Sequence, residues 1–322
     1  MTDVKLADDL QASSPEIALA LSRAGVTGVQ KAIRIRRGDA ETVMAAIIDC
    51  TVDLAADQKG VHMSRFPELF EEAIELVVEQ EALLVEALAE HIASRVVERQ
   101  KALTAEVWIR AQWPIHRRTP VTGLATQEMV TLCGIAAASE TGTKRMVGVE
   151  ATGINACPCA QGLVRNRAGE RLLEEGFDAG DVERILELVP IATHNQRGRQ
   201  TLFVGTEQDL DAEVLVDIAE RSMSAPIYDL LKRPDELFVV EHAHLQPRFV
   251  EDSVRHALRD ALATLPQLDD ADFLLSKQVN FETIHVHDVV AERYGTVGEL
   301  RSELATGEPS AHQTTLAAWL TH

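Results

Sequence analysis

The chain has 322 residues, of which 46% are hydrophobic, and its formal net charge at pH 7 is −20. A chain of this length and content can bury a full core and exceeds the usual size of one domain, so we expect two modules or one large double domain. The negative charge argues against a nucleic-acid-binding protein, because contact with many phosphates requires clustered Lys and Arg. The acidity favours a soluble protein and is also compatible with a salty cytoplasm, although charge alone does not establish halophily.

Neither a membrane span nor a signal peptide is predicted. The sequence has no run of about 18 or more apolar residues, which a membrane-spanning helix needs. Its first segment, Met1 to Ser14, carries Asp3, Asp8 and Asp9 and has no hydrophobic core. We therefore expect a cytoplasmic protein, in which the four cysteines are reduced thiols or metal ligands rather than disulfides.

The first part of the chain predicts a strand, a helix and a strand. Val43 to Leu54 is rich in β-branched and apolar residues, which indicates a buried strand. From Phe66 to Gln100 apolar residues recur every three or four positions, which predicts one long amphipathic helix with Ser64 as its N-cap. Val107 to Trp113 alternates apolar and polar residues with the period of a half-buried strand.

A hairpin and two short helices follow. Two strands, Met129–Ser139 and Lys144–Asn155, flank the turn residues Glu140-Thr-Gly-Thr143. Helices are then expected at Val164–Glu175, ended by Gly176, and at Asp181–Leu188, ended by Pro190.

The remaining patterns predict a strand, a helix, a strand-like run, a helix and a strand, at Gln200–Gly205, Asp211 to about Ala225, Leu237–Glu241, Phe249–Leu265 and Ala271–Phe281. The segment after Ala291 has weak periodicity and receives no assignment. Both halves combine helices with antiparallel strands, which predicts an α+β fold built from two similar modules. We assign the first module to residues 1–140, the second to 141–300 and a C-terminal tail to 301–322; the repeat rests on element order, because the halves share no convincing sequence identity.

Three distant segments contain residue types that bind metals: Cys157-Pro-Cys159, His194-Asn-Gln-Arg197 and Glu282-x-x-His285-x-His287. Thiols, imidazoles and a carboxylate form a ligand set for a borderline-soft divalent metal. The chain has no Cys-x-x-Cys pair, which disfavours a structural zinc finger or ribbon and favours a catalytic site with an open position.

Each motif alone also has a simpler explanation. The two cysteines could be small buried side chains, and His194 could lie in a solvated polar loop. On a strand, His285 and His287 would point to one face, with Glu282 on the other unless the chain turns. A second His-x-His pair in Glu241-His-Ala-His244 could equally be an exposed strand end. Walker, Rossmann and Gly-x-Ser-x-Gly motifs are absent, so any nucleotide must be bound by another architecture.

Taken together, eight ordered motifs between about residues 10 and 290 resemble the type IB GTP cyclohydrolase family: Gln11-Ala-Ser-Ser-Pro15, Leu21-Ser-Arg-Ala-Gly-Val26, Lys59-Gly-Val-His-Met-Ser-Arg65, Cys157-Pro-Cys159, His194-Asn-Gln-Arg197, Leu231-Lys-Arg-Pro-Asp-Glu236, Phe249-Val-Glu-Asp252 and Glu282-x-Ile-His285-x-His287. The resemblance implies the tunnelling fold, with two modules of antiparallel sheet and helices in each subunit. It also implies a homotetramer with active sites at the subunit interfaces, acting on GTP in folate or pterin biosynthesis.

The resemblance also implies roles for single residues. Cys157 and His194 match metal-binding and catalytic positions, and Glu282, His285 and His287 match the groups around the same metal. The cofactor would be one divalent metal per subunit, Fe²⁺, Mn²⁺ or Zn²⁺. Glu241 matches the glutamate that binds the guanine edge, where a carboxylate can accept two hydrogen bonds. Phosphate partners would come from the cations Lys59, Arg65, Arg197, Lys232 and Arg233, each of which could also serve only solubility.

One position departs from the family pattern. Bacterial members have a metal-binding glutamate where this chain has Pro226, so another group, such as His285 or His287, must complete the ligand set, as in the archaeal branch. The implied reaction is hydrolytic opening of the guanine imidazole ring at C8, release of formate and closure of a dihydropterin ring. Its product would be dihydroneopterin triphosphate or the 2′,3′-cyclic monophosphate. Another tunnelling-fold enzyme acting on a purine or pterin, and a non-catalytic metalloprotein, are the competing hypotheses.

Overall fold

The structure, a computed structural model, describes residues 11, 13–37, 40–79 and 84–321. The segment Met1–Ser14, on which the signal-peptide expectation rests, lies mostly outside these residues. None of the described helices has both the length and the apolar content that a membrane span requires.

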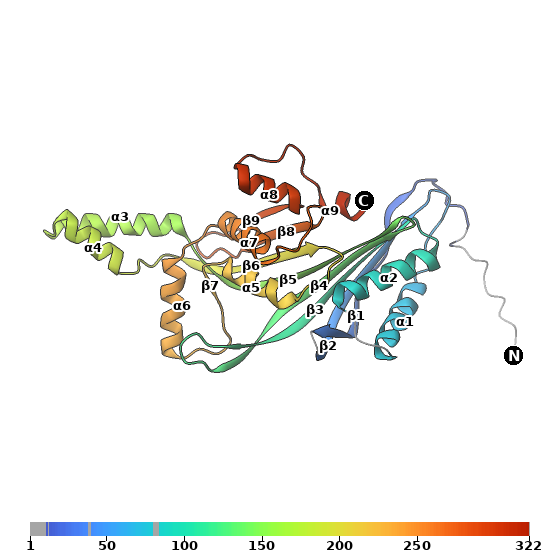
Figure 1. The fold of residues 1–322 in the computed structure, drawn as a ribbon, viewed down its shortest axis with the longest axis horizontal. Coiled ribbons are helices and arrows are strands. Elements are labelled where there is room, and N and C mark those ends of the chain that lie inside the picture. The colour runs from blue at the N-terminus through green and yellow to red at the C-terminus, as the bar shows by residue number, and fades with distance from the viewer. Residues whose placement is uncertain (1–10, 12, 38–39, 80–83, 322) are drawn as a thin grey trace.

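One antiparallel sheet of nine strands forms the body of the molecule (Figure 1). Eight strands are neighbours in the order β1-β2-β3-β4-β5-β6-β8-β9, which is their order in the chain except that β7 is skipped. The short strand β7 pairs with β5 outside this series. Their bounds are β1 Leu21–Arg37, β2 Ala40–Leu54, β3 Thr104–Arg118, β4 Ala125–Ser139, β5 Gly142–Ala156, β6 Asn195–Gly205, β7 Ala225–Pro226, β8 Phe273–Asn280 and β9 Val289–Thr296. The sheet continues from β4 to β5, so the two halves of the chain share one sheet.

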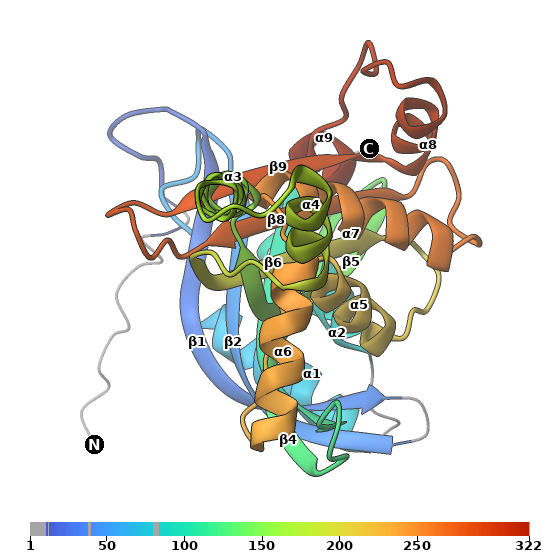
Figure 2. The same ribbon diagram turned by 90° about the vertical axis from the view of Figure 1, so that its left-hand side faces the viewer.

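Nine helices are described: α1 Arg65–Glu79, α2 Val85–Gln100, α3 Pro158–Glu174, α4 Ala179–Leu188, α5 Ala212–Arg221, α6 Arg233–Leu245, α7 Val250–Thr264, α8 Val297–Thr306 and α9 Leu316–Thr321. Helices α1, α2, α5 and α7 bury the main core against one face of the sheet, and Trp319 of α9 packs in a smaller cluster with Phe203 and Phe273. Helices α3 and α4 project from the end of the sheet, where α6 also lies (Figures 1 and 2). Accordingly, only Gly169 of α3 and only Val182 of α4 are buried.

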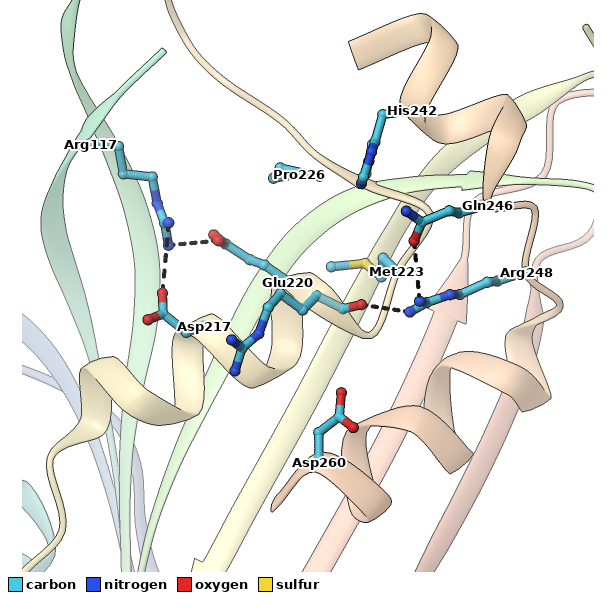
Figure 3. A pocket seen from close by; sticks show the side chains of 11 residues that line it. Arg117, Asp217, Glu220, Met223, Pro226, His242, Gln246, Arg248 and Asp260 are labelled. Atoms are coloured by element: carbon cyan, nitrogen blue, oxygen red, sulfur yellow. Dashed lines mark hydrogen bonds and ion pairs between the residues drawn. The ribbon is translucent and has the colours of Figure 1, made fainter. Parts of the chain in front are cut away.

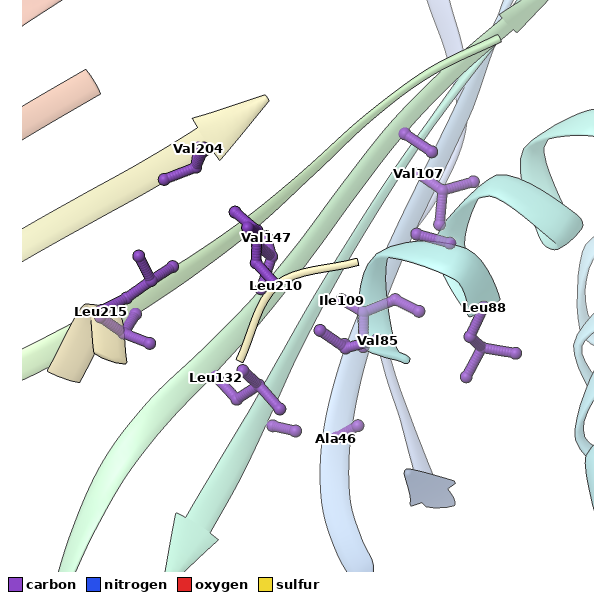
Figure 4. Packing of buried hydrophobic residues seen from close by; sticks show 14 of the residues in the cluster. Ala46, Val85, Leu88, Val107, Ile109, Leu132, Val147, Val204, Leu210 and Leu215 are labelled. Carbon is purple, nitrogen blue, oxygen red and sulfur yellow. The ribbon is translucent and has the colours of Figure 1, made fainter. Parts of the chain in front are cut away.

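The core follows directly from the alternation of side chains along the strands. In β3, Val107, Ile109 and Ala111 are fully buried, and Val85 and Leu88 of α2 pack over the same face (Figure 4). Gly134 of β4 permits this close approach, because a Cβ atom there would lie 2.5 Å from the carbonyl oxygen of Val85. Burial of such side chains contributes about 1.5–3 kcal/mol each relative to exposure.

Most predicted elements are confirmed, including the α+β class, the hairpin between β4 and β5 and the end of α3 at Gly176, which has a positive φ. The single helix predicted from Phe66 to Gln100 is wrong, since Leu84 has extended backbone angles and α2 starts after it. The strand-like run predicted at Leu237–Glu241 is also wrong and belongs to α6. The unassigned segment after Ala291 contains the end of β9, α8 and α9.

A tertiary contact explains why Leu237–Glu241 is helical although its residues favour a strand. Asp235 is fully buried and accepts hydrogen bonds from the backbone N–H groups of Val121, Thr122 and Lys232, at 2.8–3.1 Å. These bonds fix the first turn of α6 against the turn between β3 and β4. A helix start held in this way outweighs the local strand preference of Leu-Phe-Val-Val.

The division into modules at residue 140 falls in the turn between β4 and β5, and the expected boundary at residue 300 falls inside α8. Because the halves share one sheet, the two-module description stays a prediction.

Candidate active site

A cavity of about 470 Å³ lies at the end of the sheet from which α3 projects. The five residues predicted as metal ligands, Cys157, His194, Glu282, His285 and His287, all line it. The structure therefore brings together three segments of the sequence, of which the first and the last lie more than a hundred positions apart.

Strand pairing explains this convergence. Strands β5 and β6 are neighbours, and the N–H of Cys157 donates to the carbonyl of His194 at 3.2 Å, one step beyond their ladder. Strands β6 and β8 are also neighbours, and the N–H of Phe281 donates to the carbonyl of Arg197 at 2.9 Å. Since β5 ends, β6 begins and β8 ends at one edge, the residues just beyond these ends meet there.

Cys157 is fixed as the N-cap of α3. Its Sγ accepts a hydrogen bond from the N–H of Ala160 at 3.4 Å, and Pro158 occupies the first turn, where its missing N–H costs nothing. Cys159 is exposed on α3 and does not line the cavity. Only the first thiol of the Cys-Pro-Cys motif is therefore directed to the site.

His194 and Gln196, two residues apart along the chain, each carry a buried polar atom that bears on the chemistry of the cavity. Among the described residues, neither Nδ1 of His194 nor Oε1 of Gln196 has a hydrogen-bond partner, although both atoms are buried. The amide nitrogen of Gln196 donates to the Glu282 carboxylate at 3.1 Å. A buried ring nitrogen without a protein partner is open to a further ligand, and the thiol, imidazole and carboxylate groups of the cavity are of the chemical types that bind a divalent cation.

The loop from residue 281 to 288 carries Glu282 and both histidines. His285 and His287 do not lie on a strand, because β8 ends at Asn280, so the shared face that a strand would give them does not apply. Their rings are exposed and stack on each other with centroids 5.2 Å apart. Thr283 ties the loop to β6 by donating to the carbonyl of Asn195 at 3.3 Å. Within the described part of the chain, no three His, Cys, Asp or Glu side chains are arranged so that they could hold a metal ion.

A buried polar network supports the cavity from below. The side-chain amide of Asn155 donates to Asn280 at 2.9 Å and to Ser253 at 3.1 Å, and its oxygen accepts from the N–H of Ser224 at 3.2 Å. These residues are at most 2% exposed. The network joins the ends of β5 and β8 to α7. It could not be predicted from the sequence, because isolated Asn and Ser residues form no periodic pattern.

Comparison with known proteins gives the family. Residues 7–291 match the family described as type I GTP cyclohydrolase folE2. The chain belongs to this family. The GTP cyclohydrolase MptA of Methanococcus aeolicus is 39% identical over 305 residues, covering 92% of this chain and 99% of the relative. The protein of the same name from Methanosarcina acetivorans is 40% identical over 307 residues, covering 92% and 96%.

The fold has solved counterparts outside the family. The uricase of Arthrobacter globiformis superimposes with a TM-score of 0.51 at 8% identity and covers 90% of this chain and 96% of the uricase. At this level of identity the likeness concerns the fold alone. The match to the family and the identity to the two methanogen relatives confirm the resemblance drawn from the eight motifs, at the level of the cyclohydrolase family.

The residues expected to bind substrate are dispersed in the single chain. Glu241 is exposed on α6 and does not line the cavity. Lys232 and Arg233 are exposed at the start of α6, and Arg197 is exposed on β6 beside the cavity. Arg65 begins α1, far from α6 along the long axis of the molecule (Figure 1), and donates to the carbonyl of Arg99 at 3.2 Å.

The second His-x-His pair is not a metal pair, because it lies on a helix. Residues two apart on a helix point in different directions. His242 stacks on Phe238 with ring centroids 5.4 Å apart, whereas His244 is buried on another side of α6. The alternative explanation, an exposed strand end, is wrong as well, because both histidines belong to α6.

A second cavity adjoins the first and contains Pro226, the position at which the chain departs from the family pattern (Figure 3). Arg117 pairs there with Glu220 at 2.6 Å and with Asp217 at 3.9 Å. Burial raises the pKa of Glu220 to about 7, although the charge of Arg117 acts in the opposite direction. Sequence reasoning missed this cluster, because its members come from β3 and α5 and share no motif.

Proposed function

We propose that this protein is a GTP cyclohydrolase, which opens the imidazole ring of guanine at C8 and releases formate. The observation that carries the proposal is the cavity on which Cys157, His194, Glu282, His285 and His287 converge, in a chain of this family. The name shared by the two methanogen relatives, GTP cyclohydrolase MptA, supports GTP as substrate.

The ligand set of the proposal follows from the donors in the cavity. Cys157 and His194 would hold one divalent cation per subunit, with Glu282, His285 and His287 completing the set in place of the glutamate that Pro226 replaces. Thiol, imidazole and carboxylate groups suit Fe²⁺, Mn²⁺ or Zn²⁺. Bound there, the cation would supply Lewis acidity that makes water a competent nucleophile at neutral pH.

The chain's own groups would handle protons and orientation. His285 or His287, on the exposed loop, would donate a proton to the imidazole nitrogen of the substrate as the C8–N bond breaks. Gln196 would orient Glu282 through its amide N–H. Glu241 would accept two hydrogen bonds from the ring N–H and the exocyclic amine of guanine, which selects this base over adenine.

The dispersed positions of the substrate residues support an oligomer. Arg197, Lys232 and Arg233 lie at the cavity end of the chain, whereas Arg65 lies on α1, far along the molecule, and could reach the phosphates of a bound GTP only from a second copy. A homotetramer with interfacial sites and the tunnelling fold would satisfy this requirement. We also propose a cytoplasmic location and a dihydroneopterin phosphate as product, either the triphosphate or the 2′,3′-cyclic phosphate.

The test is the release of formate from GTP labelled at C8, combined with the metal content per subunit. A cyclohydrolase releases one formate per GTP consumed and carries bound metal. Another purine or pterin enzyme of the same fold would release no formate from GTP and need not carry metal. A non-catalytic metalloprotein would hold metal and consume none of these substrates.

A further inference from the structure

His244 is buried between α6 and the segment that leads to His194. It is only 6% exposed. Its Nδ1 lies 2.8 Å from the carbonyl oxygen of Val240, one turn earlier in α6, and its Nε2 lies 3.2 Å from the carbonyl oxygen of Thr193. Carbonyl oxygens only accept, so a ring nitrogen that carries a hydrogen can donate to the carbonyl oxygen it faces.

Gln161 completes the same junction from α3. Its side-chain nitrogen donates to the carbonyl of His244 at 2.6 Å and to the carbonyl of Ile191 at 2.8 Å. One side chain of α3 therefore holds both the end of α6 and the segment 191–194. Gln161 lies one helical turn after Cys157, whose carbonyl accepts the N–H of Gln161 at 3.1 Å.

The junction joins three elements that each carry one residue of the proposed site. Cys157 caps α3, His194 follows Thr193, and Glu241 lies on α6 three residues before His244. Packing alone does not need a histidine here, because an apolar side chain would fill the space without polar atoms to satisfy. The polar contacts instead fix the orientation of α6 relative to the His194 segment.

We propose that His244 is a positioning residue, which with Gln161 holds the guanine-binding Glu241 and the ligand His194 in register. The inference rests on the proposed function, because it takes Glu241 as the residue that binds guanine and His194 as a ligand of the metal. His244 touches neither the substrate nor the cation. It acts by keeping the two halves of the site in one arrangement.

The test compares His244→Phe, His244→Gln and the control His242→Phe in the full chain. Phenylalanine keeps an aromatic ring and removes both ring nitrogens, whereas glutamine keeps a side-chain N–H donor. His242 lies two residues away on the same helix and makes none of these contacts. Amide hydrogen exchange of residues 191–196 and kcat/KM for formate release from GTP are measured for each.

In His244→Phe we expect exchange of residues 191–196 to accelerate by about tenfold or more, and kcat/KM to fall by a similar factor, as the loss of a buried hydrogen-bonded junction requires. His244→Gln should recover part of both, and His242→Phe should match the unmodified chain. Equal values for His244→Phe and the control would overturn the proposal. Uniform acceleration over all peptides would also overturn it, because that result indicates a general loss of stability.

The two proposals fail in different ways. If the unmodified protein releases no formate from GTP, the proposed function is wrong. The exchange comparison then still decides whether His244 holds the segment 191–196, because that measurement needs neither substrate nor turnover.

Discussion

Two neighbouring cavities at one end of the sheet contain similar numbers of polar groups but differ in how these groups are satisfied. In the cavity around Pro226, opposite charges pair with each other, above all Arg117 with Glu220 at 2.6 Å. In the cavity around Cys157, Glu282 meets only the neutral amide of Gln196 among the described hydrogen bonds and ion pairs, and Nδ1 of His194 has no partner.

The difference separates a structural cluster from a binding site. A charged group that already has an ion-pair partner gains less from a ligand, whereas unpartnered donors and acceptors have a desolvation cost that a ligand can offset. Volume does not make this distinction, since the cavity with paired charges is the larger one, about 570 Å³ against about 470 Å³. We therefore assign chemistry to the smaller cavity.

The largest effects are expected at Cys157 and His194. Changing either residue to Ala should lower formate release by more than about a hundredfold, because loss of a metal ligand costs more than loss of a group that supports one. The far-ultraviolet circular dichroism spectrum should stay unchanged, since neither side chain belongs to the hydrophobic core.

Cys159→Ala is the matched control for the thiol. Cys159 is exposed and does not line the cavity, so its replacement should have a mild effect. An essential Cys159 together with a dispensable Cys157 would show that the thiols have been assigned in the wrong order.

The next effect concerns the recognition of guanine. Glu241→Gln replaces one acceptor oxygen by a donor that meets another donor, which should cost about 3 kcal/mol or more, on the order of a hundredfold in kcat/KM for GTP. Titration with GTP and measurement of bound metal check the result together. Unchanged kinetics would mean that another group reads the base, and loss of metal would move Glu241 into the coordination shell.

A smaller effect should follow from the network beneath the cavity. Asn155→Ala leaves the N–H of Ser224 without its acceptor and removes two donated hydrogen bonds, so the free energy of unfolding should fall by about 2–3 kcal/mol. Urea denaturation measures this change. The exposed Asn195 is the control. An equal fall in the free energy of unfolding in Asn195→Ala would show that the buried network does not stabilise the fold more than an exposed Asn does.

The smallest effect on activity is expected at Glu220, in the cavity with paired charges. Burial raises its pKa from 4.5 to about 7, so the folded protein binds more protons than the unfolded chain between these values. Stability should therefore fall as pH rises through this window, by up to roughly 3 kcal/mol. Glu220→Gln should lack this dependence while formate release stays within a few-fold of normal.

Denaturation at several pH values, run in parallel on both proteins, checks this prediction. If the curves of stability against pH are parallel, the Glu220 carboxyl is not titrating in this range. A large loss of formate release would instead bring the second cavity into the active site.

The sequence predicted the elements whose patterns are local. The alternation in β3 and the hairpin between β4 and β5 depend on neighbouring residues and appear at their expected positions. The break at Leu84 was missed because α1 and α2 both bury apolar faces, so the helical period continues across it without Gly or Pro. Helix α6 was missed because its start depends on the contacts of Asp235 with Val121 and Thr122, which lie more than a hundred residues away.

The same limit applies to the site. Cys157, His194 and the Glu282–His287 loop could be found from residue type and motif, since metal-binding side chains are recognisable in a sequence. Gln196, Asn155 and His244 could not, because their importance comes from partners in other elements and from burial. The supporting contacts of the site are therefore visible only in the fold.

Formate release by the metal-depleted and reloaded protein tests the central claim most directly. The protein is treated with a chelator, then titrated with Fe²⁺, Mn²⁺ or Zn²⁺ and assayed with GTP labelled at C8. We predict that formate release is lost with the metal and returns in full at one divalent cation per subunit. Full activity in the metal-free protein, or consumption of GTP without formate, would contradict the account.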